Sequence, residues 1–128
     1  MIVVDTNIIA YFFINCGFSG TVEKVFARDP LWAAPVLWRS EFRSVLAKCV
    51  GTSHLKLEDA VAIAAAAEGM MAGNEYAVKS PDVLRLAAST GCSAYDAEFI
   101  VLARDLGTKL VTADVRLQNA FPETAFPP

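Results

Sequence analysis

The order of hydrophobic and polar positions along the chain switches between two patterns. Short runs of β-branched and other apolar residues predict strands at residues 2–4, 31–34, 75–78 and 109–112. Longer stretches with apolar residues three and four positions apart predict helices at residues 7–14, 19–27, 35–50, 57–71, 80–91, 93–107 and 114–120. Strands that alternate with helices are typical of an α/β fold with a parallel sheet.

Proline, glycine and serine set several of the expected boundaries. The third helix is expected to begin at Pro35, since proline fits the first turn of a helix, and to end at Gly51. Ser93 is expected to cap the helix that follows it. The tail of residues 121–128 contains three prolines, so it is expected to hold at most a last edge strand.

Composition predicts one domain over residues 1–128. Of these 128 residues, 55% are hydrophobic and 20% are charged, which is typical of a chain that buries a core. No apolar run is long enough to cross a bilayer and no leader pattern begins the chain, so we expect a cytoplasmic protein without a membrane partner. The cysteines Cys16, Cys49 and Cys92 are odd in number and far apart, which argues against a disulfide framework or a zinc site.

Two acidic residues follow predicted strands. Asp5 comes directly after residues 2–4, and Asp114 comes after Thr112 and one alanine. In an open parallel sheet, ligands bind outside the carboxyl ends of the strands, so these two acids are candidates for one shared crevice. Taken singly, each is better explained as a helix N-cap.

A third acid lies beside the apolar stripe of a predicted helix. Glu41 falls between Leu37 and Val45 at four-residue spacing, on the margin of the stripe of residues 35–50. A carboxylate beside a core face is costly unless it has a partner.

Asp96 repeats this arrangement in the helix of residues 93–107. Periodicity places it on the apolar face, whereas Glu98 and Asp105 are expected to project away. An equally good explanation is a capping box formed by Ser93 and Asp96.

Together, the four acids predict a divalent-cation site. Clustered carboxylates repel one another and burial raises their pKa values, and a cation relieves both effects. Mg²⁺ prefers hard oxygen ligands and can activate a water molecule for attack on a phosphodiester. The chain has a net charge of −3 and a pI of about 5.0, which is unfavourable for binding nucleic acid unless a metal ion supplies positive charge.

The acids also form a pattern that resembles a PIN-domain nuclease. It is carried by Asp5-Thr6-Asn7, by Glu41, by Ser93-x-x-Asp96-Ala97 and by Leu110-Val111-Thr112-Ala113-Asp114. More narrowly, the chain is similar over nearly its whole length to the VapC-type toxins of toxin–antitoxin pairs.

This resemblance implies a fold, an activity and a set of partners. The fold would be three-layered, with a central parallel sheet between helices. The activity would be cleavage within RNA, including structured RNA such as tRNA, by a water activated at Mg²⁺ or Mn²⁺. The resemblance also implies a homodimer and a small antitoxin protein as partner. The implied catalytic residues and metal ligands are Asp5, Glu41, Asp96 and Asp114, with Asn7 and Thr112 in support.

Two other classes of function compete with this one. A phosphoacceptor receiver domain has a similar size and sheet, but Asp5 lacks an adjacent acid and no predicted mid-chain strand ends in aspartate. A PIN-like module that binds RNA or protein without cutting stays open as the alternative.

Basic and aromatic residues leave two further questions open. Arg39, Arg43 and Lys48 either touch RNA phosphates or form a solvated face, and the second explanation is favoured. Trp32 and Trp38, with the aromatic stretch of residues 11–13, either form an antitoxin groove or pack in the core, and core packing is favoured.

Overall fold

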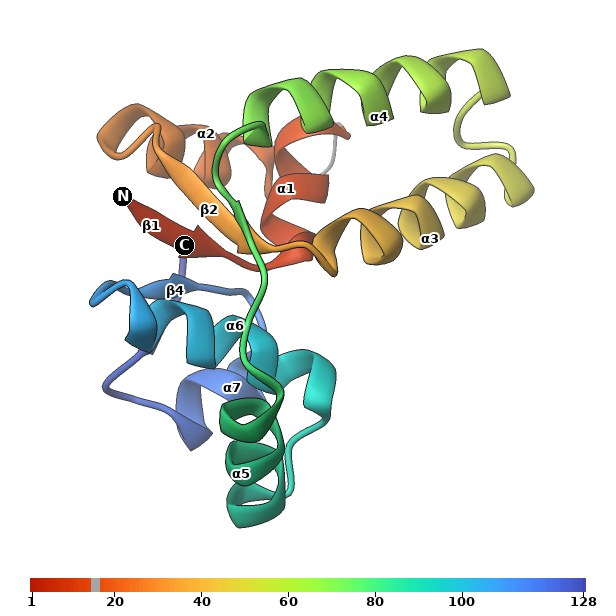
Figure 1. The fold of residues 1–128 in the computed structure, drawn as a ribbon. Coiled ribbons are helices and arrows are strands. Elements are labelled where there is room, and N and C mark those ends of the chain that lie inside the picture. The colour runs from red at the N-terminus through yellow and green to blue at the C-terminus, as the bar shows by residue number, and fades with distance from the viewer. Residues whose placement is uncertain (15–16) are drawn as a thin grey trace.

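The computed structural model describes residues 1–14 and 17–128 and arranges them as a five-stranded sheet with helices on both faces (Figure 1). The strands are β1 (Ile2–Val4), β2 (Trp32–Pro35), β3 (Glu75–Tyr76), β4 (Leu110–Val111) and β5 (Ala125–Phe126). The helices are α1 (Thr6–Phe13), α2 (Ser19–Arg28), α3 (Trp38–Gly51), α4 (Leu57–Met71), α5 (Ser80–Thr90), α6 (Ala94–Asp105) and α7 (Val115–Ala120). The expected α/β fold is confirmed.

The sheet is parallel throughout, with strand order β3-β2-β1-β4-β5. Figure 1 shows α1, α2 and α4 on one face of the sheet and α6 and α7 on the other. Because helices cover both faces, the strands are apolar on both sides. The central strand residues Val3, Val4, Ala33, Ala34 and Leu110 are accordingly completely buried. This is the three-layer arrangement that the resemblance implies.

Aromatic side chains fill the layer between the sheet and α1–α2. The Phe12 ring lies 4.8 Å from that of Phe26 and 5.3 Å from that of Trp32, and Trp38 packs on Phe42 at 5.7 Å. Both tryptophans are buried. Their core-packing role is therefore confirmed, and they do not form a groove open to an antitoxin.

The start of α3 differs from expectation. Pro35 ends β2 and α3 begins at Trp38, so the predicted helix start at Pro35 is wrong. Ala34 donates its N–H to the Asn74 carbonyl on the β3 side. Successive strand residues direct their N–H groups to opposite neighbours, so the nitrogen of Pro35 faces the other side, where β1 ends at Val4. In the register of β1 and β2 the Val4 carbonyl faces this nitrogen, and proline has no N–H to donate, so the pairing of the two strands ends there.

The C-terminal tail contributes the expected edge strand. β5 pairs in parallel with β4, with Leu110 N–H donating to Thr124 O at 2.8 Å and Thr112 N–H to Phe126 O at 2.9 Å. The second of these bonds carries the β4 ladder one residue beyond Val111. It thereby fixes the backbone of Thr112, which follows the carboxyl end of the strand.

Cys49 and Cys92 are free thiols, whereas Cys16 lies outside the described residues. Within residues 1–14 and 17–128, no helix is both long and apolar enough to cross a membrane.

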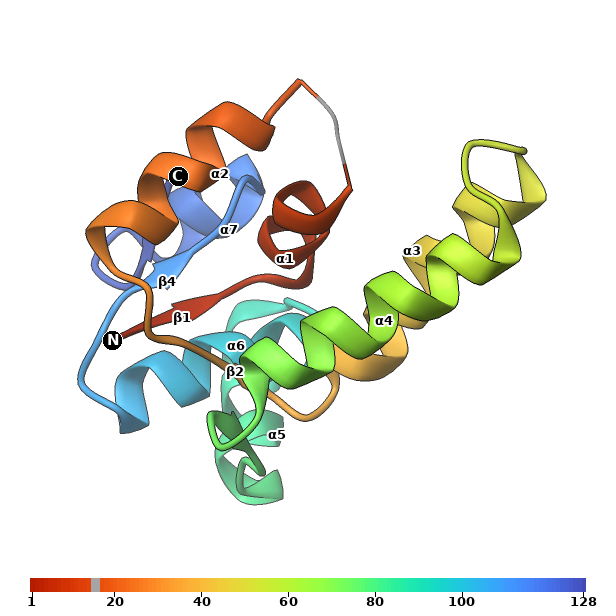
Figure 2. The ribbon, with the colours of Figure 1, turned by 90° about the horizontal axis from the view of Figure 1, so that it is seen from above.

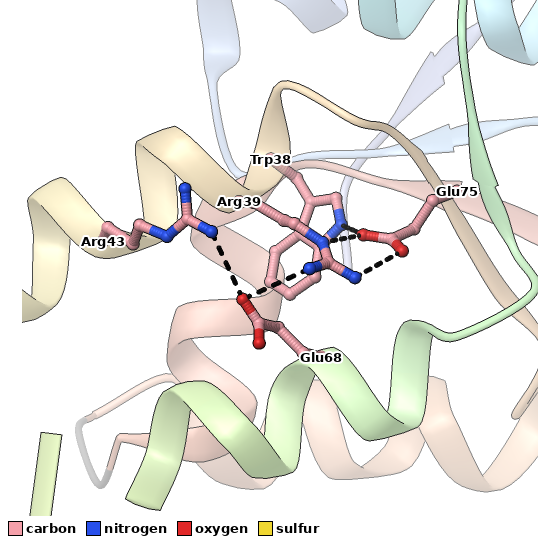
Figure 3. Close-up of polar contacts among 5 residues, drawn as sticks. All are labelled: Trp38, Arg39, Arg43, Glu68 and Glu75. Atoms are coloured by element: carbon pink, nitrogen blue, oxygen red, sulfur yellow. Dashed lines mark hydrogen bonds and ion pairs between the residues drawn. The ribbon is translucent and has the colours of Figure 1, made fainter. Parts of the chain in front are cut away.

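Helices α3 and α4 form an antiparallel pair that extends beyond the sheet (Figure 2). A polar cluster joins the base of this pair to β3 (Figure 3). Glu75 accepts hydrogen bonds from Arg39 at 2.6 and 2.8 Å and from the Trp38 indole N–H at 2.7 Å. Glu68 lies 3.5 Å from guanidinium nitrogens of both Arg39 and Arg43. The Arg39 hydrogen bond holds the pKa of Glu75 below its ordinary value.

We expect Glu75→Ala to lower the free energy of unfolding by about 1–3 kcal/mol, because the buried indole N–H of Trp38 loses its acceptor. Glu75→Gln keeps an acceptor oxygen and removes only the charge, so its loss should be smaller. Urea denaturation at neutral pH measures both. Equal losses would mean that the ion pair, and not the indole hydrogen bond, stabilises this cluster.

Candidate active site

The first acid lies where the order of the strands reverses. Asp5 follows β1, and its backbone N–H donates to Val111 O of β4 at 3.0 Å. Its carboxylate accepts a hydrogen bond from the Thr112 hydroxyl at 2.7 Å, although Asp5 occupies the N-cap position of α1. Since the chain runs from β1 to β2 on one side and returns to β4 on the other, Asp5 stands at the switch point of the sheet, where open α/β sheets bind ligands.

The second acid, Glu41, is hydrogen-bonded to Thr6, the threonine that follows Asp5. Glu41 lies in the first turn of α3 and is half-buried. Its Oε1 accepts a hydrogen bond of 2.7 Å from the hydroxyl of Thr6, the residue next to Asp5. Thr6 is buried, so this bond fixes the Glu41 carboxylate beside the start of α1. Sequence reasoning did not single out Thr6, although it belongs to the Asp5-Thr6-Asn7 motif.

The third acid, Asp96, interacts electrostatically with the first two. Asp96 lies in the first turn of α6, and its backbone N–H donates to Ser93 Oγ at 3.0 Å. The Ser93 cap is therefore confirmed, whereas no bond from the Ser93 amide back to the Asp96 carboxylate is present in the described part of the chain. The Asp96 charge raises the pKa of both Asp5 and Glu41.

Glu98 corrects the sequence expectation. It was expected to project away from the apolar face of α6, yet it is half-buried, and burial raises its pKa. Its charge also contributes to the raised pKa of Glu41. Asp105 is exposed, as expected.

The fourth acid is both a helix cap and a neighbour of the site. Asp114 accepts the Arg116 backbone N–H at 2.9 Å and the Arg116 guanidinium at 3.0 Å. These bonds, above all that of the guanidinium, hold the pKa of Asp114 below its ordinary value. The Thr112 hydroxyl, which donates to Asp5, accepts the Asp114 N–H at 3.0 Å. Thr112 thus joins the first and fourth acids.

Burial dominates the electrostatics of the two central acids. Desolvation is the largest cause that raises the pKa of Asp5 and of Glu41, and neighbouring carboxylates add to it. Hydrogen bonds from Thr112 and Thr6 partly offset the increase. Asn7 is exposed, and its backbone N–H also favours the charged form of Asp5. The hydrogen bonds of the site therefore do not fully compensate for the desolvation of these two carboxylates.

A family model of the PIN domain matches residues 2–122. The chain belongs to the PIN domain family. PIN domains are generally nucleases and typically use divalent metals. No curated protein sequence is close enough to the chain to match it.

Solved structures share this PIN fold at low sequence identity. PAE2754 from Pyrobaculum aerophilum is 19% identical with a TM-score of 0.76, covering 96% of this chain and 81% of that one. FitAcB from Neisseria gonorrhoeae is 19% identical with a TM-score of 0.71, covering 100% and 98%. VapBC2 from Rickettsia felis, bound to a DNA fragment from its promoter, is 13% identical with a TM-score of 0.65, covering 99% and 98%.

The carboxylates of this PIN domain suit a hard cation without forming a closed cage. Among residues 1–14 and 17–128, no three His, Cys, Asp or Glu side chains are grouped so that they could hold a metal ion as they lie. Each of three acids accepts a side-chain hydrogen bond, Asp5 from Thr112, Glu41 from Thr6 and Asp114 from Arg116. Mg²⁺ usually takes one or two protein carboxylates and several waters, so the donor set fits it.

The basic residues proposed to flank the site are engaged elsewhere. Arg39 and Arg43 pair with Glu68, and Arg39 also with Glu75, at the base of the α3–α4 pair (Figure 3). Lys48 is exposed near the end of α3. Arg43 and Lys48 are exposed, in agreement with the favoured explanation of a solvated face, whereas Arg39 is half-buried between Glu68 and Glu75.

We expect Glu41→Gln to stabilise the metal-free chain at pH 7 by about 0.5 kcal/mol, a small value because solvent screens a half-exposed charge. The pKa of Glu41 is raised in the folded chain, so the wild type loses stability as pH rises from the ordinary value of 4.5 through the raised value. The stability that Glu41→Gln adds should therefore develop as pH rises through this range, and it should be absent below pH 4.5. Urea denaturation in EDTA at several pH values measures it.

Glu75→Gln is the matched control, and its effect on the free energy of unfolding should have the opposite sign: it should destabilise the chain at pH 7. The pKa of Glu75 is lowered, so its stabilising effect is present above the ordinary value and is lost as pH falls. A Glu41→Gln chain that is less stable than the wild type at pH 7 would show that the fold stabilises the charged Glu41 carboxylate. That result would contradict the raised pKa of Glu41.

Proposed function

We propose that this PIN domain is a metal-dependent endoribonuclease and the toxin of a type II toxin–antitoxin pair. The observation that carries the proposal is that Thr112 and Thr6 hold the half-buried carboxylates of Asp5 and Glu41 at the switch point of the sheet, where burial disfavours their charge. Like charges at a partly buried place destabilise a fold unless they serve a ligand. A cation that in turn binds a phosphodiester is such a ligand, and it agrees with the nuclease character of the family.

Asp5, Glu41, Asp96 and Asp114 are the residues that we propose as catalytic residues and metal ligands. When bound, Mg²⁺ or Mn²⁺ supplies positive charge that activates water and stabilises the negative charge of the phosphate in the transition state. Thr112 holds the carboxylate of Asp5 in a fixed orientation, and Thr6 does the same for Glu41. Asn7, exposed in the first turn of α1, is proposed to support Asp5.

A small antitoxin is proposed to cover this site. The similarity to VapC-type toxins supports such a partner, and so does the likeness in fold to the structures named FitAcB and VapBC2. Two large apolar side chains flank the acids, because Tyr95 precedes Asp96 and Val115 follows Asp114, and they are 62% and 61% exposed. We propose that the antitoxin makes apolar contact with these two side chains. A homodimer in the cytoplasm completes the proposal.

The competing candidate is a PIN-like module that binds RNA or protein without cutting. The observations that favour it are the pairing of Asp114 with Arg116 and the lack, in the described residues, of three acids grouped as metal ligands. Cleavage separates the two candidates directly.

We expect the purified chain to cleave structured RNA in Mg²⁺ or Mn²⁺ and to lose this activity in EDTA. Asp96→Asn should lower the rate at least ~10²-fold, since even partners of metal ligands cost 10–100-fold when replaced. Gel analysis of end-labelled RNA measures both effects.

Asp105→Asn is the control, because Asp105 lies on the same helix but is exposed. It should leave the rate within about twofold of the wild type. A folded wild-type chain that binds RNA but cuts none, with either metal, would leave the binding module as the function.

A further inference from the structure

Arg116 lies against the acidic site from the side of α7. Its guanidinium is 3.0 Å from Asp114 Oδ2, and its side chain is 85% exposed. The Asp114 hydrogen bond, with the charges of Asp114 and Asp96, raises the pKa of Arg116. A permanent positive charge therefore stands beside two of the four acids in a chain whose net charge is −3.

The partner of Arg116 is easily exchanged. An exposed ion pair contributes little because solvent screens it, so the guanidinium can leave Asp114 at small cost. The planar guanidinium fork matches two oxygens of a phosphate as well as it matches a carboxylate. If Asp114 serves as a metal ligand, its charge is shared with the metal and its hold on Arg116 weakens.

A pocket of about 360 Å³ adjoins Arg116. It lies between the end of α5, the start of α6 and α7, and both Asp96 and Arg116 line it, together with Cys92, Ser93 and Leu117. Its wall combines apolar and polar groups, and its volume is within the range of pockets that enclose small ligands. One nucleoside fits such a space, and the acidic site opens on the same pocket through Asp96.

We propose that Arg116 binds a phosphate of the RNA next to the one that is cleaved, and that the adjoining pocket receives the nucleoside attached to it. This inference rests on the proposed function, since it requires RNA at the acidic site. Arg116 would then be a substrate-binding residue, and the residues of α5, α6 and α7 that line the pocket would influence which nucleoside is bound.

The test measures RNA binding apart from cleavage. The full chain carrying Glu41→Gln, which slows cutting, is titrated into a fluorescent, random-sequence, single-stranded RNA in Mg²⁺ at several salt concentrations. Adding Arg116→Gln should raise the Kd about fivefold, uniformly across sequences. It should also reduce the salt slope, log Kd against log salt, by about 0.7, as expected for the loss of one phosphate contact to a single strand.

Arg85→Gln is the matched control, because Arg85 is 79% exposed and pairs with an aspartate on α5 away from the pocket wall described here. It removes the same charge and should leave both the Kd and the salt slope unchanged. Equal effects of the two substitutions would overturn the inference, since they would reflect net charge alone.

A third variant separates the pocket from the phosphate contact. Ala120 is exposed at the end of α7 and lines the pocket, so Ala120→Leu reduces its volume. It should weaken RNA binding without changing the salt slope, and unchanged binding would show that the pocket holds no nucleoside. If the wild type cleaves RNA while Arg116→Gln binds like its parent, only this inference fails. If the chain neither binds nor cleaves RNA, the proposed function fails with it.

Discussion

The burial of carboxylates at the switch point of the sheet is the constraint on which the site depends. Asp5 is placed there because β1 ends between β2 and β4, and its charge is then partly removed from water. Glu41 and Asp96 arrive on separate helices whose first turns meet the same edge of the sheet. An apolar core does not stabilise buried carboxylate charge, so a ligand of positive charge explains this arrangement.

Two buried threonines, Thr6 and Thr112, orient the carboxylates of Glu41 and Asp5 in the absence of such a ligand. Thr112 donates to Asp5 and accepts the backbone N–H of Asp114, while Thr6 donates to Glu41. Each hydroxyl orients a carboxylate but leaves its charge in place, so the acids stay ready for a cation. The fold and the chemistry are thus connected through the ends of β1 and β4, where backbone geometry and side-chain hydrogen bonds coincide.

The pattern of apolar residues was enough to predict most of the fold, because apolar runs alternate with longer helical stretches, and glycine, proline or serine mark several of the boundaries. It was not enough for Pro35, whose place at the end of β2 depends on the pairing of that strand with β3. It also misplaced Glu98, because half-burial at the edge of α6 depends on what packs nearby. Thr6 and Arg116 were not singled out, since their roles depend on contacts across the fold and with Asp114.

Binding of Mn²⁺ to the wild-type chain, followed by thermal unfolding and by the electron paramagnetic resonance of the free ion, tests most directly whether the acids form one cation site. We expect saturable binding that raises the Tm by several degrees at about 100 times the Kd. Asp5→Asn should abolish this binding and Asp105→Asn should leave it intact. Equal binding by all three chains, or none by the wild type, would contradict the assignment of Asp5, Glu41, Asp96 and Asp114 to a metal site.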